Sequence, residues 1–472
     1  MAALCALIGH VSATASDAPN PFTASDAVPA VPFAQALRFW LKLGFISFGG
    51  PAGQIAVMHR ELVERRRWIS ERRFLHALNY CMLLPGPEAQ QLATYIGWLM
   101  HGPIGGIVAG ALFVLPSLVI LVGLSWVYMA FGDVAAVAGI FYGIKPVVAA
   151  IVLQALWRIG GRTLRDAQGH ARPLMASIAL AAFVGLAVLG LPFPLVLLLA
   201  ALAGVVGSRL VPGQFEVSPP PVHLAGARAS APALIDDDTP PPPHARHDRR
   251  RVLRVLGIAA TLWIGSMALV VSLHGADGTL ARMAWFFTKA ALLTFGGAYA
   301  VLPYVYQGAV EQAQWLTGAQ MIDGLALGET TPGPLIMVVA FVGFVGGWTK
   351  EVLGESLVLG GVLAACVATW FTFLPSFVFI LAGGPLVEAT HGQLRFTAPL
   401  TAITAAVVGV IASLALFFLV HVLWPGVGAF DAVALVLVLA AAAALLRWRV
   451  GVIPVIGAGA LAGLLLRLAG WA

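Results

Sequence analysis

The segments Phe48-Gly49-Gly50 and Pro85-Gly86-Pro87 return in the second half of the chain as Phe295-Gly296-Gly297 and Pro332-Gly333-Pro334. Both copies are displaced by the same 247 positions (295 − 48 and 332 − 85), so the two halves align here without a gap. Other residues share the pattern: Lys42, Glu64 and Trp68 recur as Lys289, Glu311 and Trp315, and Leu115-Pro116-Ser117 recurs 259 positions later as Leu374-Pro375-Ser376. This regularity indicates an internal duplication.

The composition of the duplicated chain is that of a membrane protein. Hydrophobic residues make up 60% of it and charged residues only 10%, with a mean hydropathy of +0.92. A soluble domain holds about 45–50% apolar and about 25% charged residues. Many apolar runs are long enough to cross a bilayer, which predicts an all-α polytopic fold. Duplicated membrane chains are typically transporters of two related halves.

Charge and cysteine content exclude several other classes. The net charge of +6 comes from arginines and lysines in a few loops, which is typical of topology signals rather than of nucleic-acid binding. We therefore expect membrane lipids as partners and no nucleic acid. The three cysteines, Cys5, Cys81 and Cys366, have no motif spacing, so we expect no disulfide framework, no metal site and no cofactor.

The apolar runs divide the chain into five parts. We predict a disordered N-terminal tail over 1–32, a first repeat over 33–210, a flexible polar linker over 211–251, an extra transmembrane helix and loop over 252–279, and a second repeat over 280–472. The linker is rich in proline and charge and is too polar to build a core. The extra helix has no counterpart in the first half, so one additional crossing reverses the second repeat.

The arginine distribution independently predicts inverted topology. Six arginines lie between Pro51 and Leu84, whereas the matching stretch from Ala298 to Thr331 contains no arginine or lysine. Short cytoplasmic loops collect these residues, so the two stretches are predicted to face opposite sides. The tryptophans that follow, Trp68 and Trp315, are interpreted as interfacial anchors.

The glycine and proline motifs predict broken helices at matching depths. Gly-Gly-Pro and Pro-Gly-Pro interrupt a helix, and the run 83–101 is therefore expected to be re-entrant. Backbone groups freed within a membrane are tolerated only in protein or beside water, so paired breaks indicate a midplane binding site. Helix N-termini there favour an anion. The predicted substrate-binding residues are Phe48, Gly49, Gly50, Gln54, Pro85, Gly86, Pro87, Phe295, Gly296, Gly297, Pro332, Gly333 and Pro334.

Two lysines and two threonines complete the predicted substrate site. Lys42 and Lys289 lie inside apolar runs, where a charge is costly, and two cations would suit a tetrahedral dianion. The alternative is that both side chains reach to the interface. Thr330 and Thr331 are predicted either to donate hydroxyls to an oxyanion or to cap the next helix.

Two carboxylates adjoin the Pro-Gly-Pro motifs. Glu88 follows Pro87, and Glu329 precedes Thr330, so the two do not align under the repeat. We predict proton coupling for both, with helix capping or a salt bridge to a basic residue as alternatives. No catalytic residues are predicted, because two carboxylates without a nucleophile or metal cluster supply little for an enzyme acting on lipid phosphates.

These motifs resemble the chromate ion transporter family. The resemblance rests on Phe48 to Gln54, Glu61 to Trp68, Leu84 to Gln91, Phe295 to Tyr299 and Glu329 to Pro334, and it covers both halves. It implies the long two-domain form, a multi-pass inner-membrane protein that expels chromate and confers resistance. Short one-domain forms pair in opposite orientations, which agrees with the inverted topology predicted above. A homodimer is a further possible partner of this chain. Sulfate is a similar tetrahedral dianion, so an oxyanion transporter of the sulfate type remains the alternative.

Overall fold

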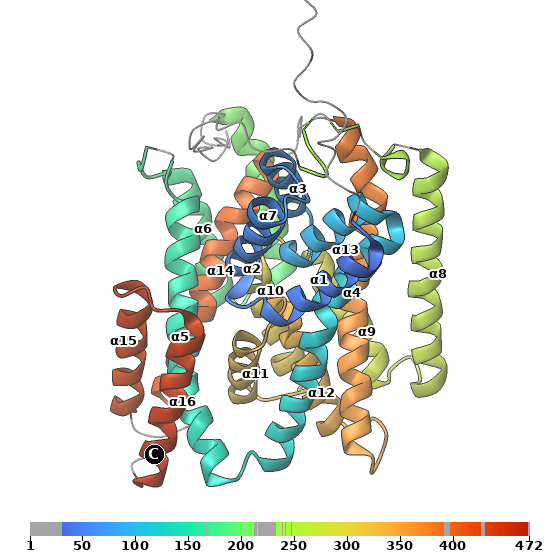
Figure 1. Cartoon of the computed structure of the whole chain (residues 1–472). Coiled ribbons are helices and arrows are strands. Elements are labelled where there is room, and N and C mark those ends of the chain that lie inside the picture. The colour runs from blue at the N-terminus through green and yellow to red at the C-terminus, as the bar shows by residue number, and fades with distance from the viewer. Residues whose placement is uncertain are drawn as a thin grey trace, which may run out of the picture.

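The computed structural model describes residues 31–166, 168–211, 215, 233–237, 239–240, 242–246, 248–390, 397–425 and 430–470. Within these ranges the chain is helical, and its extended segments form only two isolated β-bridges. Six of the helices are long and apolar enough to cross a membrane, and Figure 1 shows the helical chain as a whole. This confirms the predicted all-α polytopic membrane fold. The predicted N-terminal tail lies outside the described residues except for its last two.

The helices follow one another in two matching series joined by an extra helix. The first series is α1 (Phe33–Ile46), α2 (Gly50–His59), α3 (Glu71–Leu83), α4 (Glu88–Phe131), α5 (Ala135–Thr163), α6 (Pro173–Ala187) and α7 (Phe193–Leu210). A short turn, η3 (Pro243–Ala245), precedes the extra helix α8 (Arg249–His274). The second series is α9 (Thr279–Leu293), α10 (Ala298–Tyr306), α11 (Gly318–Thr330), α12 (Val338–Thr349), α13 (Leu357–Thr390), α14 (Thr397–Leu423), α15 (Ala432–Leu446) and α16 (Val452–Leu468).

The two series repeat one another down to single residues. Helices α3 and α11 begin and end 247 positions apart, and α6 and α15 begin and end 259 positions apart. A π-helical turn follows α2 at η1 (Arg60–Arg65) and α10 at η4 (Gln307–Gln312). Each turn leads to a residue with positive φ, 52° at Arg67 and 50° at Gln314. The sequence duplication is therefore also a duplication of backbone structure.

The repeated tryptophans are part of the core rather than interfacial anchors. Trp68 and Trp315 are only 4% and 3% exposed. Their rings lie 4.9 Å and 5.5 Å from the rings of Phe39 and Phe286, the matching residues of α1 and α9. The interpretation as anchors was wrong because each turn folds back and buries its tryptophan against the first helix of its own repeat.

Helix α3 and the first part of α4 form a helical hairpin. Helix α4 departs from helical geometry at His101 and Gly102, so its first arm is short and a long second arm returns. Arg73 of α3 and Tyr95 of α4 both bind Glu388 of α13, at 2.9 Å and 2.5 Å. Residues on either side of the Pro-Gly-Pro break thus meet one carboxylate, so the two arms lie side by side. The run 83–101 is therefore bounded by the Pro-Gly-Pro break at one end and by the hinge at His101 and Gly102 at the other.

The last two helices of each repeat pack on the other repeat. Helix α5 packs against α15 and α16, and α14 packs against α6 and α7; α5 and α16 lie together in Figure 1. Glycines allow backbone contact at these crossings: a β-carbon on Gly143 would overlap the carbonyl oxygen of Gly459, and one on Gly409 would overlap that of Ala179. Small residues permit such close approach between membrane helices. The two repeats are therefore intertwined.

The extra helix and the preceding polar segment differ in how they pack. Helix α8 lies at the edge of the molecule, and none of its residues is buried (Figure 1). The described part of the segment predicted as a flexible linker packs on the first repeat: Ile235 pairs with the backbone of Trp68, and Arg73 donates to the carbonyl of Thr239. Its apolar residues Ile235 and Ala245 are buried. This packing could not be predicted from the overall polar composition of the segment.

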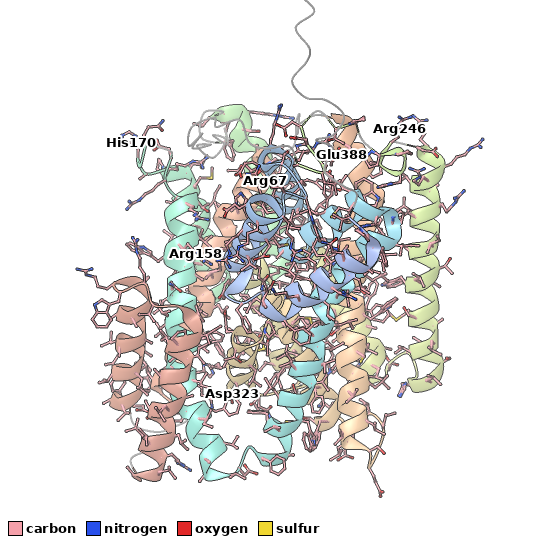
Figure 2. The ribbon with its side chains drawn as sticks, viewed as in Figure 1. Arg67, Arg158, His170, Arg246, Asp323 and Glu388 are labelled. Carbon is pink, nitrogen blue, oxygen red and sulfur yellow. The ribbon has the colours of Figure 1, made fainter. Side chains whose placement is uncertain are left out.

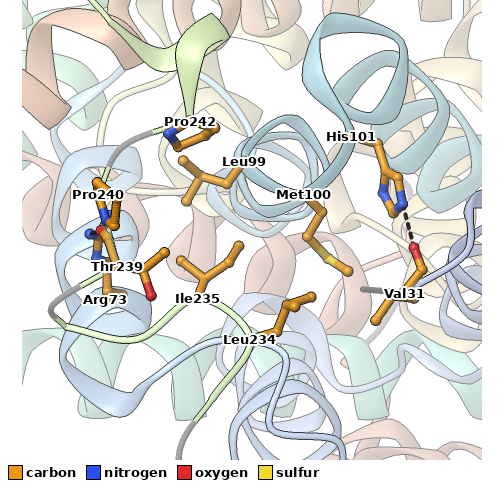
Figure 3. A pocket seen from close by; sticks show the side chains of 10 residues that line it. All are labelled: Val31, Arg73, Leu99, Met100, His101, Leu234, Ile235, Thr239, Pro240 and Pro242. Atoms are coloured by element: carbon orange, nitrogen blue, oxygen red, sulfur yellow. Dashed lines mark hydrogen bonds between the residues drawn. The ribbon is translucent and has the colours of Figure 1, made fainter. Parts of the chain in front are cut away.

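A cavity of about 280 Å³ lies where this segment meets the hinge of α4 (Figure 3). The hinge residue His101 contacts the carbonyl oxygen of Val31 at 2.9 Å, on the wall of this cavity. Its other lining residues are Arg73, Leu99, Met100, Leu234, Ile235, Thr239, Pro240 and Pro242. None of them is a predicted substrate-binding residue.

The Gly143 crossing gives a stability test. Gly143→Val places side-chain atoms against the backbone of α16, and overpacking of this kind costs about 1–3 kcal/mol. We expect a lower Tm for the purified protein in detergent. Gly161→Val is the matched control, because Gly161 lies on the same helix and a β-carbon there meets nothing within 4 Å. Equal Tm values for the two variants would contradict the intertwined packing.

Candidate functional site

Four helix interruptions, here called tips, form the candidate site. The Phe-Gly-Gly tips lie between α1 and α2 and between α9 and α10, and the Pro-Gly-Pro tips between α3 and α4 and between α11 and η5 (Leu335–Met337), which leads into α12. Their glycines adopt φ values that other residues avoid, including 88° at Gly49, 125° at Gly86, 93° at Gly297 and 99° at Gly333. The repeated glycines are thus required by the backbone of each tip.

The tips of the two halves bind one another reciprocally. The backbone N–H of Gly86 donates to the carbonyl of Thr294, which precedes Phe295, at 2.7 Å. The backbone N–H of Gly333 donates to the carbonyl of Ser47, which precedes Phe48, at 2.8 Å. These two bonds are equivalent under the 247-residue offset. Each Pro-Gly-Pro tip is therefore paired with the Phe-Gly-Gly tip of the other half.

Gln54 adds a side-chain bond to this junction. Its Nε2 atom donates to the carbonyl of Gly333 at 2.5 Å, and its side chain is buried. The structure thus brings the predicted residues together in two pairs of tips: Phe48, Gly49, Gly50 and Gln54 with Pro332, Gly333 and Pro334, and Phe295, Gly296 and Gly297 with Pro85, Gly86 and Pro87.

Both predicted carboxylates lie at the start of α10. An Oε1 atom of Glu88 lies 3.9 Å from the β-carbon position of Gly297. Glu329 is buried and accepts a hydrogen bond from the hydroxyl of Tyr299, two residues further along. Arg158 of α5 is near enough to act electrostatically on Glu329, and Figure 2 shows Arg158 at mid-height in the molecule. Two acids that do not align in sequence therefore meet the same tip.

The two threonines bind their own helix. The hydroxyl of Thr330 donates to the carbonyl of Leu327 at 2.8 Å, and that of Thr331 donates to Gly328 at 3.1 Å. They close the last turn of α11 and do not cap the helix that follows. In this conformation neither hydroxyl is free to donate to an anion.

The two lysines lie away from the tips. Lys42 and Lys289 are exposed on the outer surface of α1 and α9, and the ammonium of Lys289 lies 5.8 Å from the ring of Trp285. The buried face of α1 is formed by Phe39, Leu43 and their neighbours, and Lys42 is on another face. This placement favours the alternative in which both side chains reach to the membrane interface.

Buried polar atoms without partners surround the tips. Among the described residues, the hydroxyls of Ser47, Ser117 and Ser376 and the amide oxygens of Gln54, Gln90 and Gln91 have no hydrogen-bond partner. Such atoms are rare in proteins and call for a specific explanation, such as a ligand. The recurrence of Leu-Pro-Ser is the only sequence signal for Ser117 and Ser376, and it does not by itself predict that they belong to the site.

Helix starts supply the positive potential of the site. Helices α2, α4 and α10 begin at the tips, after Gly49, Pro87 and Gly297. In the described structure none of the three N-caps has a side-chain hydrogen bond to the helix start. Uncapped N-termini carry partial positive charge and free N–H groups, so helix starts at the tips favour an anion.

Two ionic contacts between the halves lie toward opposite ends of the molecule. Asp323 of α11 binds Lys145 at 3.3 Å and the hydroxyl of Tyr128 at 2.9 Å. Arg73 and Glu388 form the second contact, and Figure 2 shows Glu388 near one end and Asp323 toward the other. Sequence reasoning missed both contacts because their partners come from different repeats at unrelated offsets.

The fold and the site define a multi-pass membrane transporter built of two related halves that meet at broken helices. The model of the chromate transporter family matches residues 34–205 and 281–464, three quarters of the chain and one region in each half. The chain belongs to the chromate transporter family. It is a transporter and not an enzyme.

Several proteins named as transporters are similar to this chain. A chromate transport protein of Pseudomonas aeruginosa is 32% identical over 400 residues, 83% of each chain. A chromate transport protein of Cupriavidus metallidurans is 28% identical over 408 residues, 84% of this chain and 86% of its own. The uncharacterized transporter YwrB of Bacillus subtilis is 29% identical over 134 residues, 28% of this chain and 68% of its own. No solved structure matches the chain.

The exposed lysines yield a prediction that separates their two interpretations. We expect Lys42→Gln and Lys289→Gln to keep anion transport within about twofold of the native protein, because interfacial side chains contribute little to a buried site. Transport rates per molecule in proteoliposomes are the measurement. A strong loss in both variants, with normal membrane insertion, would support the substrate-binding role instead.

Proposed function

We propose that this protein is a secondary active transporter that exports chromate across the inner membrane, confers chromate resistance and is driven by the proton motive force. The observation that carries the proposal is the reciprocal junction of four tips, with uncapped helix starts and unpartnered hydroxyls around it. Such a junction suits a tetrahedral oxyanion. The names of the relatives from Pseudomonas aeruginosa and Cupriavidus metallidurans support chromate as that anion.

We further propose that the two repeats have inverted topology. The two equivalent hydrogen bonds between the tips are what a two-fold relation between the halves would produce. Arg67, Arg246 and His170 gather toward one end of the molecule, whereas Asp323 of the second repeat lies toward the other (Figure 2). A single extra helix, α8, joins the repeats and accounts for the reversal.

Proton coupling is assigned to Glu88 and Glu329. Both adjoin the tip that begins α10, and Glu329 is buried beside Tyr299. A carboxyl group at membrane depth can exchange a proton as the site changes its access to water. Because both acids meet the same tip, a change in their charge acts directly on a bound anion.

Two other functions explain less of the site. Sulfate has the same shape and charge as chromate, so sulfate transport is the alternative within the same site. An enzyme acting on lipid phosphates would need a nucleophile or metal cluster, and the described residues contain no group of His, Cys, Asp or Glu suited to a metal ion.

Transport into inside-out membrane vesicles tests the proposed direction and coupling. Energised vesicles that contain the protein should accumulate labelled chromate, and an uncoupler should abolish the accumulation. Unlabelled sulfate as competitor measures selectivity. Accumulation that survives the uncoupler would contradict proton coupling, and vesicles that accumulate none would contradict export.

The carboxylate variants sharpen this assay. Glu88→Gln and Glu329→Gln should lose uphill accumulation but keep exchange of labelled for unlabelled anion, because exchange needs no net proton movement. Glu351→Gln is a suitable control, since Glu351 is exposed in the turn between α12 and α13. Unimpaired uphill accumulation in both site variants would contradict the assignment.

Equivalent positions in the two repeats test the topology. Arg72 and Ala319 are both exposed and are 247 positions apart, at the starts of α3 and α11. In a background without the native cysteines, Arg72→Cys should react with an impermeant thiol reagent only in inside-out vesicles. Ala319→Cys should react only in intact, right-side-out membranes. Labelling of both from the same side would refute inverted topology.

A further inference from the structure

The repeated Leu-Pro-Ser motifs place one serine of each half against the Pro-Gly-Pro tip of the other half. A β-carbon on Gly333 would lie 3.3 Å from the hydroxyl oxygen of Ser117, on α4. A β-carbon on Gly86 would lie 2.5 Å from the hydroxyl oxygen of Ser376, on α13. Both hydroxyls therefore face the junction, and they do so in equivalent positions, 259 residues apart.

Two other buried hydroxyls on the same helices have partners, whereas those of Ser117 and Ser376 do not; within the described structure the hydroxyl of Thr369 on α13 also lacks one, but Thr369 belongs to none of the tips. Ser125 on α4 donates to the carbonyl of Leu121 at 2.6 Å, and Thr372 on α13 donates to that of Ala368 at 2.7 Å. Ser117 and Ser376 are equally buried, at 0% and 1% exposure, yet have no partner among the described residues. A buried hydroxyl normally takes the carbonyl one turn earlier, so its failure to do so at both equivalent sites needs an explanation.

A third hydroxyl belongs to the same cluster. Ser47 lies in the first Phe-Gly-Gly tip, is fully buried and also lacks a partner, although its carbonyl binds Gly333. The other unpartnered atoms at the junction are the oxygens of Gln54, Gln90 and Gln91, which only accept hydrogen bonds. The serines are therefore the side-chain donors that remain unused around the tips.

We propose that Ser117, Ser376 and Ser47 donate hydrogen bonds directly to the transported oxyanion, as its neutral side-chain ligands. This inference rests on the proposed function and names the atoms that bind its substrate. Hydroxyl donors together with helix N-termini suit a tetrahedral dianion, which offers acceptor oxygens in all directions. No lysine is needed, in agreement with the exposed positions of Lys42 and Lys289.

The arrangement also defines the class of substrate. Ser117 and Ser376 belong to opposite halves and each faces a tip of the other half, so their hydroxyls are positioned for an anion only while the two halves are engaged. A hydroxyl donor contacts an oxygen atom of the anion and does not contact the central sulfur or chromium atom. Sulfate and chromate should therefore depend on the same serines to the same degree.

Binding of sulfate and of chromate to the purified full-length protein tests the inference. We expect Ser117→Ala and Ser376→Ala each to weaken the Kd for both anions at least about tenfold, because a hydrogen bond to a charged ligand is lost. The double variant should bind neither anion measurably. Calorimetry or anion-dependent thermal shift is the measurement.

The Tm of the anion-free protein separates a binding role from a structural one. Removal of a hydroxyl that has no partner should leave this Tm unchanged or raise it. A structural role predicts a lower Tm and an unchanged Kd. Ser125→Ala and Thr372→Val are the matched controls on the same two helices, and both should bind the anions like the native protein.

The outcomes distinguish this inference from the proposed function. If the native protein binds the anions and the serine variants bind them equally well, the serine ligands are refuted while oxyanion transport stands. If the native protein binds neither sulfate nor chromate, the proposed function itself fails. Weaker binding with an unchanged or higher Tm supports both.

Discussion

A peptide group without a hydrogen-bond partner is costly in the interior of a membrane, and this cost shapes the centre of the molecule. Four helices stop part-way through the fold and free backbone groups at their ends. The N–H groups of Gly86 and Gly333 are satisfied by carbonyls of the opposite repeat. The interruptions are therefore stable only where the two halves meet, and the helix starts that follow them are fixed at the same place.

Much of this fold could be predicted from sequence because glycine and proline carry positional meaning of their own. Gly-Gly-Pro and Pro-Gly-Pro interrupt helices in almost any context, so the breaks and their duplication followed from the residues. The places of Glu88 and Glu329 beside the tips followed as well, since they adjoin the motifs directly.

Side-chain orientation was harder to predict, because it depends on which face of a helix is covered. Lys42 and Lys289 share apolar runs with buried residues but lie on the uncovered face. The sequence around Trp68 and Trp315 is typical of interfacial residues, but in the structure a folded-back turn buries both side chains. Ser117 and Ser376 could not be assigned to the site from sequence, because the tips that they face come from the other repeat. The residues around each serine give no indication of that contact.

The exchanged pairs of terminal helices have a consequence for how such a protein can be assembled. Helices α6 and α7 find their main partner in α14, and α15 and α16 find theirs in α5. When the first repeat has been synthesised, the face of α5 that packs against α15 and α16 is therefore still uncovered, and it is covered only after the second repeat has been made. A chain with only one repeat could form the same packing only as a dimer, in which the last two helices of each copy pack on the other copy. Fusion into one polypeptide removes that search and fixes the ratio of the two halves at one to one.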